Sequence, residues 1–81
     1  MKKVIIQNQQ TMEVKPCICG SYPEFIQPDY YYTDIWLKCR CGRRTQNTGG
    51  FDYASEIPER IARETAIIKW NDDEVYMEAN I

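Results

Sequence analysis

Four cysteines are the residues of this chain whose types and spacing best suit a chemical role. They form two Cys-x-Cys pairs, Cys17 with Cys19 and Cys39 with Cys41, separated by nineteen residues. Two close cysteine pairs at about this separation are typical of zinc ribbons, although the usual pair is Cys-x-x-Cys, one residue longer. Four thiolates complete a tetrahedral zinc and leave no position for water or substrate. The pattern therefore predicts one structural Zn²⁺ ion.

Other uses of the four cysteines are two disulfides, an iron–sulfur centre or a catalytic thiol. Disulfides are rare in reducing compartments, and the start of the chain has too short an apolar stretch for a secretory signal. We therefore expect a cytoplasmic protein, in which disulfides are less plausible than a metal site. The sequence has no histidine, which excludes a Cys–His nucleophile pair. Its twelve carboxylates form no obvious acid–base pair, so we predict that the protein is not an enzyme.

The elements that must position the cysteines are two turns and a hairpin. Gly20 and Gly42 each follow a cysteine pair and permit a tight turn with positive φ, in which backbone amides point at the sulfurs. Strands are predicted at 22–27 and 30–39, joined by a turn at 28–29, because the second is rich in aromatic and β-branched residues. Its alternation puts five residues on one face and five on the other: Tyr31, Thr33, Ile35, Leu37 and Cys39 against Tyr30, Tyr32, Asp34, Trp36 and Lys38. A polar return strand is expected at 43–48.

A helix is predicted after Gly49-Gly50. Ser55 is its expected N-cap, Pro58 lies in its first turn, and the acidic run after Asn71 favours an end there. Trp70 is expected to pack from the helix end onto the sheet, and the expected buried stripe is Ile57, Ile61, Glu64 and Ile68. Short strands are predicted at 3–8 and 74–79, either paired with each other or extending the sheet.

These elements predict a small α+β zinc ribbon. It would have an antiparallel sheet, two Cys-x-Cys-Gly knuckles and one C-terminal helix packed on the sheet. Residues 1–81 would form a single domain, with the ribbon core at 15–71 and terminal extensions at 1–14 and 72–81. A chain of 81 residues has a small core, which makes a stabilising metal ion useful.

The charge is unevenly distributed. Residues 36–48 carry four positive charges and no acid, whereas residues 49–81 carry three positive and eight negative charges. The basic segment is either a solvated edge that discourages strand aggregation or a surface that binds phosphates, with aromatic residues that stack on bases. The candidate residues for contact with a partner or a nucleic acid are Tyr30, Tyr32, Trp36, Lys38, Arg40, Arg43 and Arg44.

Residues 15–71, which are 57 of the 81, also carry motifs of a known family. They are Lys15-Pro16-Cys17-Ile18-Cys19-Gly20, Ile35-Trp36-Leu37-Lys38-Cys39-Arg40-Cys41-Gly42 and a helix ending in Ala66-Ile67-Ile68-Lys69-Trp70-Asn71. In this order they resemble the restriction-alleviation (Lar-like) zinc ribbons of phages and prophages. Both knuckles are one residue shorter than in that family.

The resemblance implies a phage-type protein in a bacterial host cell that dampens host restriction. We therefore expect a non-enzymatic zinc-binding protein that modulates a host system by contacting a host protein. Alternatives are a ribbon that binds nucleic acid through the basic and aromatic residues, or a structural subunit of a larger assembly. A membrane or a small-molecule substrate is not an expected partner.

Overall fold

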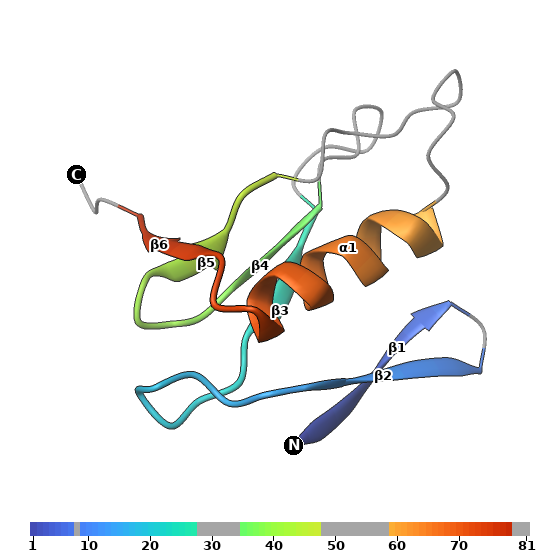
Figure 1. Cartoon of the computed structure of the whole chain (residues 1–81), viewed down its shortest axis with the longest axis horizontal. Coiled ribbons are helices and arrows are strands. Elements are labelled where there is room, and N and C mark those ends of the chain that lie inside the picture. The colour runs from blue at the N-terminus through green and yellow to red at the C-terminus, as the bar shows by residue number, and fades with distance from the viewer. Residues whose placement is uncertain (8, 28–34, 48–58, 79–81) are drawn as a thin grey trace.

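The computed structural model describes residues 1–7, 9–27, 35–47 and 59–78 (Figure 1). These residues form two antiparallel sheets and one helix, which agrees with the predicted α+β class, although the sequence predicts a single sheet. One sheet is a hairpin of two strands, and the other has four strands in the order β3-β4-β5-β6. The elements are β1 (Lys2–Gln7), β2 (Gln10–Val14), β3 (Glu24–Ile26), β4 (Trp36–Lys38), β5 (Arg43–Thr45), α1 (Glu59–Asn71) and β6 (Val75–Met77).

The alternation predicted for the second strand is confirmed in its described part. Ile35, Leu37 and Cys39 are buried, whereas Trp36 and Lys38 between them are half-buried. β4 pairs with β3 so that Leu37 lies opposite Phe25. This period of two follows from the pleat, which points successive side chains to opposite faces. The part of the prediction that concerns Tyr30–Asp34 lies outside the described residues.

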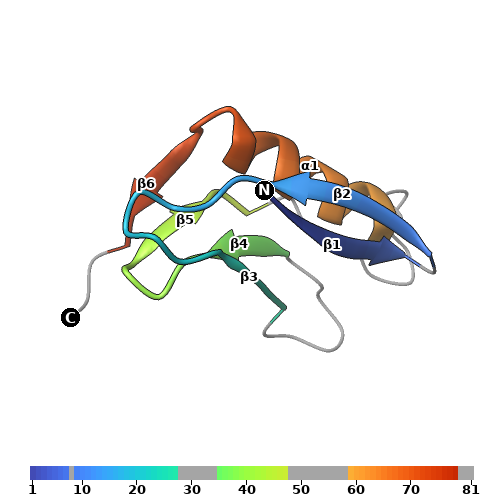
Figure 2. The same ribbon diagram turned by 90° about the horizontal axis from the view of Figure 1, so that it is seen from below.

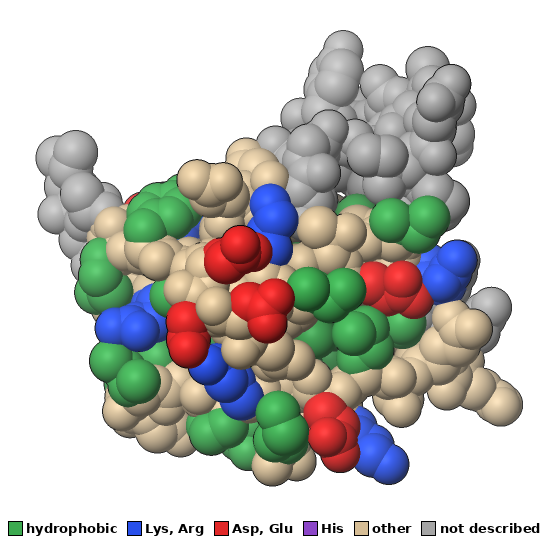
Figure 3. Space-filling model, viewed as in Figure 1, with side chains coloured by type: hydrophobic (Ala, Val, Ile, Leu, Met, Phe, Trp, Pro, Cys, Tyr) green, Lys and Arg blue, Asp and Glu red, His purple; other side chains and the backbone are tan. Residues whose placement is uncertain are grey.

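The helix buries a different face from the one predicted. Its buried residues are Ala62, Ala66, Ile67 and Trp70. The expected stripe is wrong, because Ile61 is 40% exposed and Ile68 is 51% exposed. Figure 3 accordingly shows hydrophobic side chains at the surface beside acidic ones. Of the other helix predictions, Ile57, Ser55 and Pro58 lie outside the described residues.

The physical reason for this difference is the charge within the predicted stripe. Glu64 lies between Ile61 and Ile68 on the stripe, and burial there would remove its carboxylate from water at a high cost. In the structure Glu64 is only half-buried and forms an ion pair with Arg60 at 2.8 Å. The face that packs instead contains two alanines, which let the helix backbone approach the strands closely.

The end of the helix agrees with the prediction, and it leads directly into β6. The helix ends at Asn71, and Asp73 takes a positive φ of 61°. The amide of Glu74 donates to the carbonyl of Lys69 at 2.9 Å, which satisfies one carbonyl of the last helical turn. The reversed chain then enters β6, which pairs with β5 at the edge of the four-stranded sheet.

The N-terminal residues form a hairpin of which the sequence predicts only the first strand. β1 was expected, but β2 was not, and β1 pairs with β2 rather than with β6. Ile6 and Val14 from this hairpin join the hydrophobic core that contains Leu37, Ile67 and Trp70. The helix contacts β1 and β2 as well as β4 and β5, as the two views together indicate (Figures 1 and 2). Residues 1–14 thus contribute to the same core as the predicted ribbon.

Within the described residues, no helix has both the length and the apolar character that a membrane span requires.

Candidate metal centre

The first cysteine pair lies on a tight loop between β2 and β3. The amide of Cys17 donates to the carbonyl of Ser21 at 2.7 Å, and the amide of Gly20 donates back to the carbonyl of Cys17 at 2.9 Å. Gly20 has a φ of 93°, which a side chain would strain. The loop therefore closes on itself through its own backbone, and the predicted tight turn is confirmed here.

The second cysteine pair lies on a loop between β4 and β5 that repeats this backbone pattern. The amide of Cys39 donates to the carbonyl of Arg43 at 2.8 Å, and the amide of Gly42 donates to the carbonyl of Cys39 at 2.9 Å. Gly42 has a φ of 101°. Two loops with the same hydrogen bonds and the same glycine position present their cysteines in equivalent ways.

The two loops bring all four cysteine sulfurs together. The Sγ atoms of Cys17, Cys19, Cys39 and Cys41 lie within 4.8 Å of one another. Across the loops, Cys17 and Cys41 have their sulfurs 3.6 Å apart, and Cys19 and Cys39 have theirs 3.3 Å apart. A tetrahedral ion with four sulfurs at about 2.3 Å requires sulfur–sulfur separations of about 3.8 Å. The four side chains thus fit a single metal ion with only small movements.

The four thiols differ in their surroundings. Burial raises the pKa of Cys17 above its usual range and raises the pKa of Cys39 to about 12. Cys19 is exposed, and the backbone amide of Ser21 donates to its sulfur, which lowers its pKa to about 6. In this fold Cys19 therefore loses its proton easily, whereas the buried thiols of Cys17 and Cys39 would lose theirs only next to a positive charge such as a metal ion.

The end of the helix holds the first cysteine loop in place. The indole Nε1 of Trp70 donates to the carbonyl of Lys15 at 2.9 Å, and the amide of Lys15 donates to Oδ1 of Asn71 at 3.1 Å. The side-chain amide of Asn71 also donates to the carbonyl of Glu13 at 2.9 Å, and Lys15 forms an ion pair with Asp73. Trp70 and Asn71 thus fix the chain two residues before Cys17.

Sequence reasoning missed the part that Asn71 plays in this clamp. Trp70 was expected to pack in the core, which is confirmed by its 2% exposure. From the sequence, Asn71 is predicted only as the end of the helix and as part of the motif that resembles the family. The only sign of this role in the sequence is a polar residue at the helix end beside a tryptophan that is expected to be buried. The partners of Trp70 and Asn71 lie more than fifty residues away in the sequence, so the sequence does not identify them.

Arg44 is the predicted contact residue whose position differs most from expectation. It is only 6% exposed, so the interpretation of the basic segment as a solvated edge is wrong for this residue. Its guanidinium lies over the rings of Trp36 and Tyr76, at 4.1 Å and 5.4 Å from their centroids. Its Nε donates to the carbonyl of Thr45 at 3.0 Å. Arg44 is therefore committed to contacts within the protein and is not available to a phosphate.

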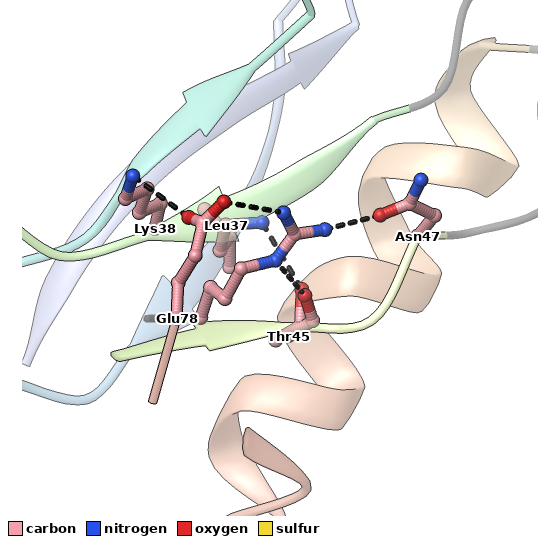
Figure 4. A network of polar contacts seen from close by, with 6 residues as sticks. Leu37, Lys38, Thr45, Asn47 and Glu78 are labelled. Carbon is pink, nitrogen blue, oxygen red and sulfur yellow. Dashed lines mark hydrogen bonds and ion pairs between the residues drawn. The ribbon is translucent and has the colours of Figure 1, made fainter. Parts of the chain in front are cut away.

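A carboxylate completes the surroundings of Arg44 (Figure 4). Glu78 forms an ion pair with Lys38 at 2.8 Å and with Arg44 at 3.6 Å, while Arg44 also donates to Asn47. The hydrogen bond from Lys38 is the main cause that lowers the pKa of Glu78. This network joins β4, β5 and the end of β6, and its physical origin is cross-strand pairing, since Arg44 lies opposite Lys38 and Tyr76.

The remaining basic residues of the segment line two different hollows beside the cysteine loops. Arg40 is exposed and lines a shallow hollow with Lys38, Tyr22 and Cys39. Arg43 instead lines a second, small pocket, with Cys17 and Trp70 among its neighbours. Lys38 and Arg40 thus line one hollow, and Arg43 lines another. Tyr30 and Tyr32 lie outside the described residues.

Because Arg44 is buried in specific contacts, we expect Arg44→Lys to be destabilising although it keeps the charge. The ammonium group of lysine is not planar, so it cannot stack on the Trp36 and Tyr76 rings as the guanidinium does. It also has too few donors in the right directions to reach Thr45 and Asn47 at the same time. The loss is about 1–2 kcal/mol of unfolding free energy, the typical value of one or two lost buried hydrogen bonds. Urea unfolding at a fixed zinc concentration measures it. Arg40→Lys is the matched control, since an exposed arginine changes stability by less than about 0.5 kcal/mol. Equal stability of the two variants would contradict the assigned network.

Comparison of the chain with protein-family models, with curated protein sequences and with solved structures gives no match. The resemblance to the restriction-alleviation zinc ribbons stays a prediction that rests on the motifs alone. The geometry of the four cysteines therefore carries the functional argument.

Proposed function

We propose that this protein is a zinc ribbon whose four cysteines bind one structural Zn²⁺ ion. The observation that carries the proposal is the meeting of four Sγ atoms within 4.8 Å, from two loops with the same backbone hydrogen bonds. Zinc prefers tetrahedral thiolate sites of this size. Cys17, Cys19, Cys39 and Cys41 would hold the ion, and its positive charge would favour the thiolate form of the buried pair.

The same donor set supports a non-enzymatic role. Four protein thiolates fill the coordination sphere of zinc, so no position stays open for a water molecule or a substrate. The zinc then acts on folding, because the binding free energy of a structural zinc is largely folding free energy. A reducing compartment such as the cytoplasm suits this use, since all four cysteines are free thiols in the structure.

The role of the folded ribbon is a second step of the proposal. The resemblance of residues 15–71 to the restriction-alleviation family supports a phage-type protein that modulates a host system through protein contacts. The nucleic-acid alternative is weakened by the burial of Arg44, which removes one of its four proposed cations.

Plating of phage on a restricting bacterial host tests the role in restriction. Expression of the protein should raise plating efficiency, and expression of its Cys39→Ser variant should not. Equal plating with and without the protein would refute the role in restriction.

The zinc site itself is tested by native mass spectrometry of the protein purified under reducing conditions. We expect one zinc per chain, lost together with secondary structure when a strong chelator is added. A folded, metal-free chain whose mass is lower by four hydrogens would instead contain two disulfides. A mass that corresponds to iron and sulfide would indicate an iron–sulfur centre. Either result would overturn the proposal.

The proposed site also predicts a steep pH dependence of zinc binding. The thiols of Cys17 and Cys39 are protonated at neutral pH before the metal binds, because burial raises the pKa of both within the fold and an ordinary cysteine of an unfolded chain has a pKa of about 8.5. Zinc binds thiolates, so binding releases at least these two protons and becomes weaker as the pH falls. Since each released proton contributes a factor of about ten per pH unit, we expect the apparent dissociation constant to rise by at least about 100-fold from about pH 7 to about pH 6. Competition with a chromophoric chelator measures it, and a flat profile would contradict proton release from the buried pair.

A further inference from the structure

The four sulfurs of the cluster differ in their access to solvent. Cys17 is 5% exposed and Cys39 is 1% exposed, and Cys41 is half-buried. Cys19 is the exposed member, and its neighbour Ile18 is 81% exposed, so the tip of the first loop projects into water. Cys19 is therefore the cysteine of the cluster that a reagent from solution reaches most easily.

The same sulfur lies close to a buried partner. The Sγ atoms of Cys19 and Cys39 are 3.3 Å apart, closer than the 3.6 Å between Cys17 and Cys41. A disulfide needs a separation of about 2.05 Å, so the two sulfurs must approach by a little more than an ångström. One sulfur of the pair comes from each loop, so a bond between them would link the two loops.

We propose that Cys19 is the site at which hydrogen peroxide modifies the metal centre, and that the modification ends in a Cys19–Cys39 disulfide with loss of the ion. This inference rests on the proposed zinc site, because metal coordination keeps both sulfurs in the thiolate form that reacts with peroxide. The metal centre is then also a redox-sensitive one, in which oxidation at a single exposed residue removes the ion that stabilises the fold.

The reaction balances in two steps. The Cys19 thiolate attacks one oxygen of hydrogen peroxide, the O–O bond breaks, and the products are a sulfenic acid on Cys19 and a hydroxide ion. The Cys39 thiolate then attacks the sulfur of that sulfenic acid, which forms the S–S bond and expels a second hydroxide. The two sulfurs together lose two electrons, and peroxide accepts them. Zn²⁺ leaves as the hydrated ion, because Cys17 and Cys41 alone do not complete its coordination.

The sequence allows a direct test of which sulfurs react. Trypsin does not cut after Lys15, since Pro16 follows, so Cys17 and Cys19 stay together on fragment 4–38. Cleavage after Arg40 places Cys39 on fragment 39–40 and Cys41 on fragment 41–43. Zinc-loaded protein is treated with limiting peroxide, zinc release is followed with a chromophoric chelator, and the digest is mapped by tandem mass spectrometry. We expect fragment 39–40 linked to 4–38 through Cys19, and reversal by dithiothreitol with added zinc.

Two matched variants keep four possible zinc ligands, because histidine also binds zinc. Cys41→His should still form the Cys19–Cys39 disulfide. Cys39→His should stop at a sulfenic acid on Cys19, which dimedone traps, and should form no disulfide. If wild-type protein binds zinc but links Cys17 to Cys41, or keeps its zinc and all four thiols, the inference is wrong and the proposed function stands. If wild-type protein binds no zinc, the proposed function fails first.

Discussion

Cys39→Ser is expected to abolish zinc binding and to unfold the protein at neutral pH. Cys39 is 1% exposed and belongs to the hydrophobic core as well as to the sulfur cluster, so its loss removes a ligand and leaves a buried hydroxyl in its place. A structural zinc site contributes about 10–16 kcal/mol of apparent binding free energy. A domain of this size has a net stability of only about 5 kcal/mol. The binding free energy of the zinc is therefore larger than the net stability of the folded domain, so the domain is expected to unfold without the metal.

Circular dichroism together with metal analysis measures this result. Removal of zinc from the wild-type protein by a chelator should give the same unfolded spectrum as Cys39→Ser. Ile18→Ser is the matched control, because Ile18 lies between two proposed ligands but is 81% exposed. It should bind zinc and fold like the wild type. A Cys39→Ser protein that keeps its fold without zinc would show that the metal does not stabilise the domain.

Trp70→Ala is the second change with a large expected effect, a loss of about 3–5 kcal/mol of unfolding free energy. Trp70 is 2% exposed and packs in the core that contains Val14, Leu37 and Ile67. It also donates a hydrogen bond to the carbonyl of Lys15, just before the first cysteine loop. The substitution therefore leaves a cavity and also removes one of the hydrogen bonds that hold the chain just before Cys17.

Denaturant unfolding at fixed free zinc measures the loss, and two variants separate its causes. Trp70→Phe keeps most of the ring but leaves the Lys15 carbonyl without its donor, so we expect a loss of about 1–3 kcal/mol. Ile68→Ala removes a large apolar side chain from the same helix, but from its exposed face, so it should change stability by less than about 0.5 kcal/mol. If Ile68→Ala were as harmful as Trp70→Ala, the assignment of the buried helix face would be incorrect.

The parts of the molecule that the sequence predicted well depend on local rules. The glycine after each cysteine pair is a local requirement of a turn with positive φ, and both turns form. The alternation around Leu37 follows from the pleat of a single strand, and the helix ends at Asn71 where acidic residues begin. The convergence of the four sulfurs could also be predicted from the sequence, because a hairpin between Cys19 and Cys39 brings its two ends together.

The parts that the sequence did not predict depend on contacts between distant segments. The helix contains more apolar residues than one face can bury, and only packing against the strands decides between Ile67 and Ile68. Arg44 belongs to a run of basic residues, but pairing with Lys38 and Tyr76 on both sides buries it. Asn71 bonds to Glu13 and Lys15, which lie more than fifty residues away. No local pattern specifies such partners.

The central claim is that all four cysteines bind one zinc ion, and X-ray absorption at the zinc K-edge tests it most directly. For the purified, zinc-loaded protein, the claim predicts a single shell of four sulfur atoms at about 2.3 Å from the metal. Cys41→His should change this shell to three sulfurs and one nitrogen at about 2.0–2.1 Å. A wild-type shell with fewer than four sulfurs, or with oxygen atoms in their place, would contradict the claim.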